Sequence, residues 1–242
     1  MNDVISQLFR RKSVRVFTDK EISAEEKNLI LDAAAQAPTA GNQQLYTILD
    51  ITDPAIKEAL VKTCDNQPFI AESKLVLIFC ADCLKWYDAF LHGGCEPRKP
   101  GVGDLLLAVS DALIAAQNAV VAAESLGIGS CYIGDIMENY EQQKALLKLP
   151  EYVFPAAMLV FGYPTEQQLN RPKPPRSPRE FIVHENGYRQ MDSKQLQQLL
   201  EVKTNQPDFH KWLQAFCQRK YNSDFSREMT RSVQKYLDEF QH

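Results

Sequence analysis

The longest apolar stretch of the chain, LLLAVSDALIAAQNAVVAAESLG beginning at Leu105, constrains the fold more than any other feature. It is long enough to span a membrane, but four polar residues interrupt it: Asp111, Gln117, Asn118 and Glu124. Carrying those groups through hydrocarbon would be costly, so a membrane span is disfavoured. The stretch predicts instead a helix from about Asp104 to Leu126. Because this helix is apolar nearly all round, we expect it at the centre of a buried core.

Short apolar runs alternate with helical patterns along the rest of the chain. KLVLIFCAD from Lys74 and AAMLVFGYP from Ala156 are continuously apolar, which is typical of strands buried on both faces. LYTILDIT from Leu45 and IGSCYIGDI from Ile128 predict two further strands or extended segments. Helices are predicted over residues 2–10, 23–37, 53–64, 139–150, 193–203 and 208–240. This alternation predicts an α/β or α+β fold.

The composition excludes several classes of protein. The chain has 242 residues, 45% of them hydrophobic and 24% charged, with a net charge of −4, so a substantial core is possible and disorder is not expected. No broad basic excess suggests a nucleic-acid partner. The first residues lack the long apolar segment of a signal peptide, and six cysteines without such a signal suggest free thiols. We therefore expect a cytoplasmic protein.

A basic cluster follows the first predicted helix. RRKSVRVF places Arg10, Arg11, Lys12 and Arg15 around the hydroxyl of Ser13. One interpretation is a solvated patch, since cations are favourable at a helix C-terminus. The other is a phosphate site, in which arginine forks and the serine hydroxyl supply charge-assisted hydrogen bonds. The cluster is local, which suggests a small anion rather than a polyanion.

A second basic stretch, RPKPPRSPR, begins at Arg171 and contains Lys173 and Arg176. It could be a polyproline II linker, or it could meet the first cluster at one anion. A third polar stretch, APTAGNQQ from Ala37, suits a turn after a helix or a hydrogen-bonding platform for a planar heterocycle. Spacing alone leaves these alternatives open.

Several catalytic and cofactor motifs are absent from the sequence. It has neither a P-loop nor the G-x-G-x-x-G pattern, and neither a G-x-S-x-G nor an H-E-x-x-H motif. Cys80, Cys83, His92 and Cys95 could supply zinc ligands, although Cys80 falls within an apolar strand where a buried thiol is common. The segment from Lys85 to Gly103 is predicted to be an irregular loop of the kind that often serves function.

Taken together and in order, RRKSVRVF, APTAGNQQ, GIGSCYIGDI and GYP…PKPPRSPREFIVHENGY resemble the FMN-dependent nitroreductase family, in its NADPH-dependent nitroreductase and flavin reductase branch. The resemblance implies an α+β fold: a three-layer sandwich with a mixed central sheet flanked by helices, in an intertwined homodimer. It also implies a single FMN-binding domain over residues 1–242, in which residues 193–242 form a C-terminal helical excursion.

The resemblance also implies which residues contact FMN. Arg11 and Ser13 would hold the phosphate, and Arg15 would lie near the pyrimidine edge of the ring. Lys12, in the same segment, is also expected to contact the cofactor. The partner subunit would contribute one further segment, which consists of Pro38, Thr39, Ala40 and Asn42. The remaining matches are Gln67, Ile133, Gly134, Asp135, Lys173 and Arg176. The chain departs from the branch at Pro174–Pro175, which adds a proline, and at Asp135, where a second glycine is common.

The activity implied is transfer of hydride from NADPH or NADH, through bound FMN, to nitroaromatics, quinones or flavins. No dedicated catalytic side chain and no metal are expected, and the partners are small-molecule acceptors and a second subunit, with no nucleic acid or membrane. One alternative is a zinc-stabilised or non-catalytic ligand-binding module. Another is the same fold with dehalogenase or dehydrogenase chemistry. The choice between NADPH and NADH and the physiological acceptor are left open.

Overall fold

The structure is a computed structural model that describes residues 1–242. The chain forms two compact units. The first contains Met1–Arg171 together with Glu228–His242, and the second contains Pro172–Arg227. The predicted excursion, residues 193–242, covers parts of both units, and its place in a single functional domain stays a prediction.

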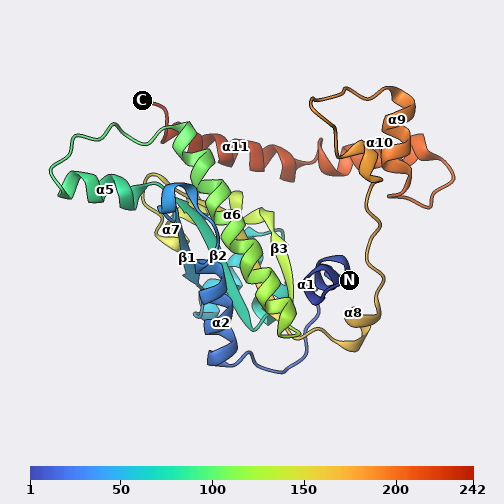
Figure 1. Ribbon diagram of the computed structural model, residues 1–242, viewed down its shortest axis with the longest axis horizontal. Coiled ribbons are helices and arrows are strands. Elements are labelled where there is room, and N and C mark those ends of the chain that lie inside the picture. Colours follow the sequence, from blue (N-terminus) through green and yellow to red (C-terminus); the bar gives the residue numbers. More distant parts are fainter. The chain divides into compact units, whose positions relative to one another are not determined.

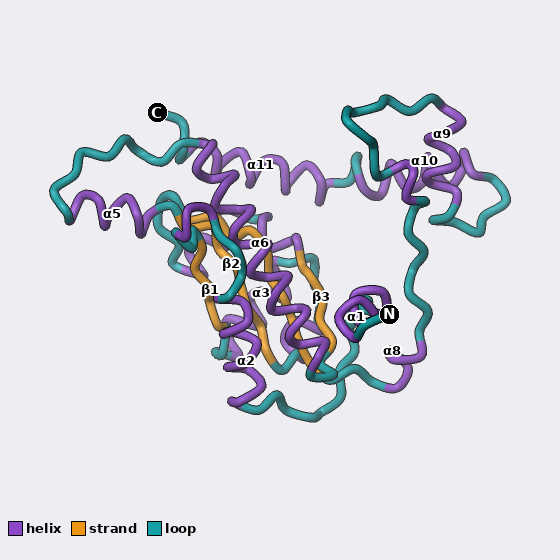
Figure 2. Tube along the Cα trace, viewed as in Figure 1, coloured by secondary structure: helices purple, strands orange, loops and turns teal.

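A four-stranded sheet is the centre of the first unit. Its strands are β1 (Tyr46–Asp50), β2 (Leu75–Asp82), β3 (Gly129–Ile133) and β4 (Val153–Gly162), arranged in the order β1-β2-β4-β3. Strands β1 and β3 lie at opposite edges of the sheet (Figure 2). Every strand pair is antiparallel. The one parallel pairing is an isolated bridge between Ser13 and Ser130, so the mixed character predicted for the sheet is confined to that edge. The two central strands are buried along their whole length, as their continuous apolar runs predicted.

Helices cover both faces of the sheet. Side chains alternate along β2, so that Leu75, Leu77 and Phe79 face one core while Val76 and Ile78 face the other. The first face is covered by α2 (Ala24–Ala35) and α6 (Val102–Ser125), which lie across the sheet in Figure 1. The second face is covered by α3 (Pro54–Thr63), α4 (Phe69–Glu72) and α7 (Tyr140–Leu147). The predicted three-layer sandwich is confirmed.

Helix α6 is the central helix that its composition predicted. By length and composition alone it could cross a membrane, yet its alanine-rich side is buried against the sheet and α2. Small side chains allow this close approach of the helix to its neighbours. The other side remains apolar and exposed in the single chain, with Leu106 62% and Leu107 46% accessible. Leu113 and Ile114 are each 40% accessible.

The segment after α1 (Asp3–Arg10) runs along the edge of the sheet. Val14 N donates to Ser130 O over 2.9 Å, and Thr18 N donates to Tyr163 O over 2.8 Å. A Cβ at position 129 would lie 2.7 Å from Val14 Cγ2, so only glycine fits there. This contact fixes the cationic residues against β3.

Two secondary-structure predictions are wrong in part. The segment from Lys85 to Gly103 begins within a helix, α5 (Leu84–His92), because Asp82 Oδ1 accepts from the amides of Leu84 and Lys85 and supports its first turn. The helix predicted over 208–240 is two helices, α10 (Phe209–Lys220) and α11 (Asp224–Asp238). The end of α11 and the residues after it return to the first unit, where Tyr236 and Phe240 enter the core.

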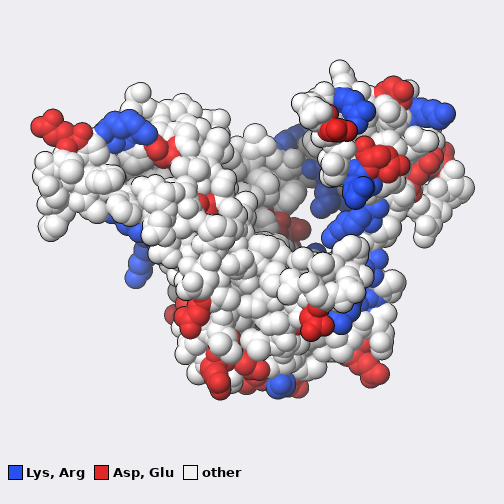
Figure 3. Space-filling model, viewed as in Figure 1, with Lys and Arg blue, Asp and Glu red and all other residues white.

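The segment after β4 contains α8 (Glu166–Asn170) and, at the end of the proline-rich stretch, a short turn at Arg179–Phe181. The second unit also contains α9 (Ser193–Glu201), which begins with a capping box between Asp192 and Gln195. On the face of the first unit seen in Figure 3, charged side chains of both signs are scattered among uncharged ones.

Candidate functional site

The side chain of Arg11 lies over the edge strand β3. Its Nη2 is 3.4 Å from Ser130 Oγ, and its guanidinium lies 5.8 Å from the centre of the Tyr132 ring. Its Nε is buried without a hydrogen-bond partner. A buried, charged donor without a partner is unfavourable unless a ligand satisfies it. Burial raises the pKa of Tyr132 to about 12, and the charge of Arg11 opposes that rise.

The neighbouring cations use their charge in different ways. Arg15 is exposed, and its guanidinium lies 5.9 Å from the centre of the Phe69 ring. Lys12 Nζ donates to the carbonyl oxygens of Leu169, over 2.7 Å, and of Arg171. The ion pairs of the structure include none of the cations of residues 10–15. This edge of the sheet therefore keeps positive charge that no carboxylate neutralises.

Ser13 is fixed between two elements of the first unit. It forms the bridge to Ser130, and its carbonyl oxygen accepts from Arg171 Nη2 over 2.6 Å. Cys131 lies buried beneath this segment, and burial raises the pKa of its thiol while the positive charge of Arg15 opposes the rise. The structure thus brings Arg11, Ser13 and Arg15 together along one edge.

Gln67 and Asp135 meet at the end of β3. Gln67 Nε2 donates to Asp135 Oδ2 over 2.7 Å and to Cys64 O over 2.9 Å. The turn that carries Asp135, Gly134–Met137, directly follows Ile133, the last residue of the strand. Gly134 is exposed, and only Met137 Cε, at 3.8 Å, lies near the position its Cβ would take. The backbone here is open to a flat ligand.

The segment Thr39–Leu45 is held by one buried carboxylate, Asp111 of α6. Asp111 is 3% exposed, and it accepts from the Thr39 hydroxyl, from Ala40 N over 3.0 Å and from Leu45 N over 3.1 Å. The Thr39 hydroxyl also accepts from Gln44 N over 2.8 Å. The Thr39 hydroxyl therefore both donates and accepts a hydrogen bond within the chain.

The same segment has an unusual backbone. Gly41, Asn42 and Gln44 all have positive φ, at 56°, 56° and 50°. Non-glycine residues are uncommon in this region and cluster at sites where the surrounding structure fixes them. Pro38 and Asn42 are exposed, so the segment presents them at the surface of the single chain.

The two remaining predicted residues, Lys173 and Arg176, belong to the second unit. They lie in its extended proline-rich segment, where Arg176 is exposed and Pro175 O accepts from Lys203 Nζ over 3.4 Å. Their convergence with Arg11 stays a prediction.

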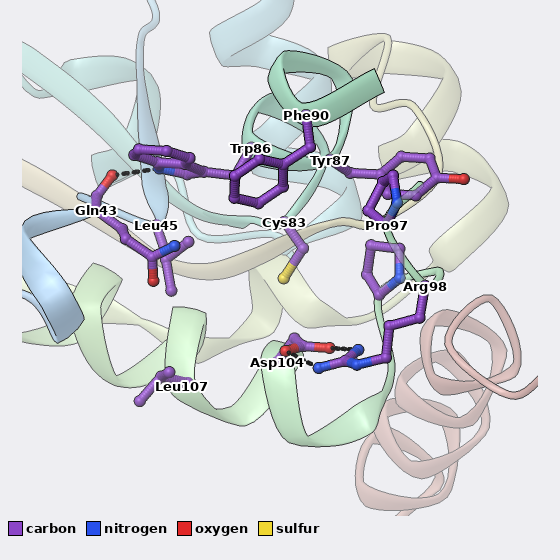
Figure 4. Close-up of a pocket in the computed structure, with 11 residues that line it drawn as sticks. Gln43, Leu45, Cys83, Trp86, Tyr87, Phe90, Pro97, Arg98, Asp104 and Leu107 are labelled. Carbon is purple, nitrogen blue, oxygen red and sulfur yellow. Dashed lines mark hydrogen bonds and ion pairs between the residues drawn. The ribbon is translucent and has the colours of Figure 1, made fainter. Parts of the chain in front are cut away.

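An aromatic pocket of about 290 Å³ is built from other elements, α5, α6 and the loop between them (Figure 4). Trp86, Tyr87 and Phe90 supply aromatic walls, and Trp86 Nε1 donates to Gln43 O over 2.8 Å. Arg98 and Asp104 form a bidentate pair at its rim, with Nη–Oδ distances of 2.5 and 2.9 Å. Gln43 and Leu45, which belong to the segment held by Asp111, also line the pocket, and a functional role for residues 85–103 stays a prediction.

The potential zinc ligands do not assemble. Cys80 and Cys83 are buried, Cys95 is exposed, and neither these cysteines nor His92 belong to any group of ligands that could hold a metal ion. Burial raises the pKa of both Cys80 and Cys83 to about 12, which disfavours the thiolate that zinc needs. The zinc-stabilised module is not supported.

The fold and its cationic edge agree with a comparison of the chain with known families. The model of the nitroreductase family matches residues 8–163. The chain belongs to the nitroreductase family.

Several nitroreductase relatives match over most of the chain. The FMN reductase (NAD(P)H) of Bacillus subtilis strain 168 is 32% identical over 228 residues, which cover 90% of each chain. The oxygen-insensitive NADPH nitroreductase of Salmonella typhimurium is 37% identical over 197 residues, which cover 81% of this chain and 79% of the relative. Among solved structures, B. megaterium NfrA2 superposes with a TM-score of 0.84 at 31% identity and covers 100% of both chains.

Some residues that shape this nitroreductase site were not singled out from its sequence. Asp111 was noted only as an interruption of an apolar helix, although a carboxylate in such a place needs donors from elsewhere. Ser130 and Tyr132, which contact Arg11, lie within the motif GIGSCYIGDI, of which only residues 133–135 were predicted to contact FMN. Glu138, three residues after Asp135, is 5% exposed, and a glutamate is rarely that buried.

Proposed function

We propose that this protein is an FMN-dependent oxidoreductase that transfers hydride from NAD(P)H to nitroaromatics, quinones or flavins. The observation that carries the proposal is the edge formed by Arg11, Ser13 and Arg15, whose cations have no carboxylate partner and whose Arg11 Nε is buried without an acceptor. An anion with several acceptor oxygens satisfies such a group, and the FMN phosphate has the right charge. The relatives named as FMN reductase and NADPH nitroreductase support the same activity.

The residues at this edge fit the phosphate end of FMN. Arg11 and the Ser13 hydroxyl would donate to phosphate oxygens. Lys12 adds positive charge at the segment, with its ammonium held by backbone carbonyls. From the second unit, Lys173 and Arg176 would complete the phosphate site, in a protein that acts as one FMN-binding domain.

The opposite end of the site suits the ring. Gln67 would meet the ring with its carboxamide oxygen, since both of its amide hydrogens are used by Cys64 and Asp135. The backbone of Ile133–Asp135, which is exposed at Gly134, would lie beside the ring. Arg15 would lie near the pyrimidine edge and stabilise negative charge there.

Bound FMN supplies the redox chemistry, accepting hydride from NAD(P)H and passing reducing equivalents to the acceptor. The chain's own residues would bind and orient the cofactor. No acid or base of the protein is assigned to the reaction, because solvent supplies the protons that the reduced acceptor takes up.

We infer that the active protein is a cytoplasmic homodimer. Its six cysteines are free thiols, as in a reducing compartment. Leu106 and Leu113 of α6 and Phe9 of α1 are apolar side chains that a second copy would cover. The partner copy would then contribute Pro38, Thr39, Ala40 and Asn42 to the site, with Asp111 holding that segment in shape.

The direct test is a visible spectrum of the purified protein, followed by steady-state oxidation of NADPH and of NADH with a quinone acceptor. We expect flavin absorption bands, and kinetics in which donor and acceptor give parallel double-reciprocal lines. Colourless protein that binds no added FMN would overturn the proposal. A protein that binds FMN but reduces no nitro, quinone or flavin acceptor would keep the cofactor site and exclude the proposed acceptors.

A further inference from the structure

Glu138 is a buried acid that the proposed reaction does not use. It follows the turn Gly134–Met137 and is 5% exposed, and its Oε1 has no hydrogen-bond partner. Its backbone N donates to Asp135 O over 3.0 Å, which folds Glu138 back over the turn. A carboxyl group in such a place is costly as an anion unless a cation or donor faces it.

The groups around Glu138 are anionic rather than cationic. Asp135 faces it from the same turn, Asp65 from the loop after α3, and Glu228 from α11. Glu228 is an anion, because its hydrogen bonds lower its pKa to about 2. The bond to Arg231 has the largest effect, and the bond to Ser232 adds to it. The Arg231 guanidinium pairs with Glu228 and Glu141, and Glu138 has no ion pair.

Neutral groups complete the surroundings. From α7, Asn139 Nδ2 donates to Thr63 O over 2.9 Å and Gln143 Nε2 donates to Thr63 Oγ1 over 3.0 Å. Cys64, which follows α3, has its pKa raised to about 12, chiefly by burial. Several effects raise the pKa of Glu138 to about 8. Burial is the largest, followed by the charges of Asp135 and Asp65, a hydrogen bond to Asp135 and the charge of Glu228.

Asp135 connects this acid to the cofactor site. Its Oδ2 holds Gln67 Nε2 at 2.7 Å, and Gln67 Oε1 makes no hydrogen bond within the chain. A second negative charge at Glu138 would repel the Asp135 carboxylate and loosen its hold on Gln67. A proton at Glu138 removes that repulsion.

We propose that Glu138 keeps its proton in the folded protein and is a positioning residue, which through Asp135 holds the Gln67 carboxamide with its oxygen open to the cofactor. The inference rests on the proposed function, because it assumes that FMN binds beside Gln67. It makes cofactor affinity depend on a proton outside the binding surface itself.

The test is the dissociation constant of FMN, measured by quenching of flavin fluorescence from pH 6.5 to 9.5. For the wild-type protein we expect a constant value near neutral pH and weaker binding above about pH 8, with a slope of at most about tenfold per pH unit. Glu138→Gln keeps a neutral polar side chain of the same size, so it should bind as the wild type does at pH 7 and lose the pH step. Glu138→Ala, which also removes the charge, should lose the pH step as well.

Two further variants separate positioning from general stability. Gln67→Ala should bind FMN more weakly without the step, because the effect of the proton acts through Gln67. Glu58→Gln, an exposed acid on α3, should keep the wild-type step. Two outcomes would overturn this inference alone, provided that FMN binds at pH 7. In one, Glu138→Gln shows the same loss of affinity above pH 8 as the wild type; in the other, the wild type shows no such loss. Absence of FMN binding at pH 7 overturns the proposed function and this inference with it.

Discussion

Two segments of the proposed site, Arg11–Arg15 and Thr39–Leu45, are both rich in polar groups but satisfy them in opposite ways. The first keeps cations without carboxylate partners and a buried Arg11 Nε without an acceptor. The second has its donors gathered by a single buried carboxylate, Asp111. One segment holds unused capacity to bind an anion, and the other is already satisfied by the chain.

The difference separates binding from support. Removing an arginine side chain from the first segment should cost affinity for the cofactor and little stability, since no carboxylate of the folded chain pairs with Arg11 or Arg15. Removing the anchor of the second should cost stability first. Glu138 offers a third case, a buried carboxyl with neither a cation nor enough donors.

Asp111→Ala is the largest expected effect. It leaves the Ala40 and Leu45 amides and the Thr39 hydroxyl without their acceptor, and breaking such a buried charged network costs about 3–5 kcal/mol. Urea unfolding at pH 7 measures the loss. The control is Ser110→Ala, its exposed neighbour on α6, which should change stability by less than about 0.5 kcal/mol. Equal stability of the two variants would break the contrast between the segments.

Glu138→Gln should act in the opposite direction to Asp111→Ala. Burial and three neighbouring anions raise the pKa of Glu138 in the folded protein to about 8. Its contribution to the free energy of unfolding is therefore fully present below about pH 4.5, the ordinary pKa of a glutamate, and is lost as the pH rises towards 8. The free energy of unfolding of the variant, relative to that of the wild type, should therefore rise by about 1.4 kcal/mol per pH unit across that window. At pH 8 the variant should be more stable by about 3–5 kcal/mol.

Urea unfolding at pH 5, 6, 7, 8 and 9 measures that difference for the two proteins. It should grow up to about pH 8 and stay level above it. A difference that is constant with pH would show that Glu138 is already ionised in the folded protein.

Much of the first unit follows from local sequence, and the failures have a common cause. The apolar runs predicted β2 and β4, and the helical pattern over residues 23–37 predicted α2, which begins with a capping box between Ser23 and Glu26. The aromatic segment after Asp82 was mistaken for a loop because the carboxylate that supports α5 belongs to the preceding strand. Proline and glycine mark most breaks between helices, but α10 and α11 are separated without either.

In the candidate site, too, contacts between residues distant in the sequence were not predicted. Motif order indicated Arg11, Ser13, Gln67 and Asp135, which the structure brings to one edge of the sheet. The role of Asp111 could not be predicted, because its partners lie 66 to 72 residues away along the chain. Hydrogen bonds over such separations depend on tertiary packing and leave no periodic signal in the sequence.

Arg11→Ala should weaken FMN binding by about 10- to 100-fold, equal to about 1.5–3 kcal/mol for a charge-assisted contact. The stability of the cofactor-free protein should change little, since the variant removes a buried Nε that has no partner and loses only a long hydrogen bond, 3.4 Å, from Nη2 to Ser130 and the contact with the Tyr132 ring. Fluorescence titration with FMN and urea unfolding without it measure the two quantities. Arg10→Ala, an adjacent and exposed cation, is the matched control and should change affinity by less than threefold or so.

Arg15 and Asp135 sharpen the comparison at the ring end of the site, where the expected effects are smallest. Reduction places negative charge on the ring, which Arg15 favours and Asp135 opposes by Coulomb interaction. Arg15→Ala should therefore make the FMN midpoint potential more negative, and Asp135→Asn more positive, each by about 30 mV, or about 1.4 kcal/mol for a two-electron couple. Spectroelectrochemical titration at pH 7 measures both. Because the two variants differ in the sign of the charge removed, a shift in the same direction would mean that one of them acts by moving the ring, and that Arg15 and Asp135 do not face it together.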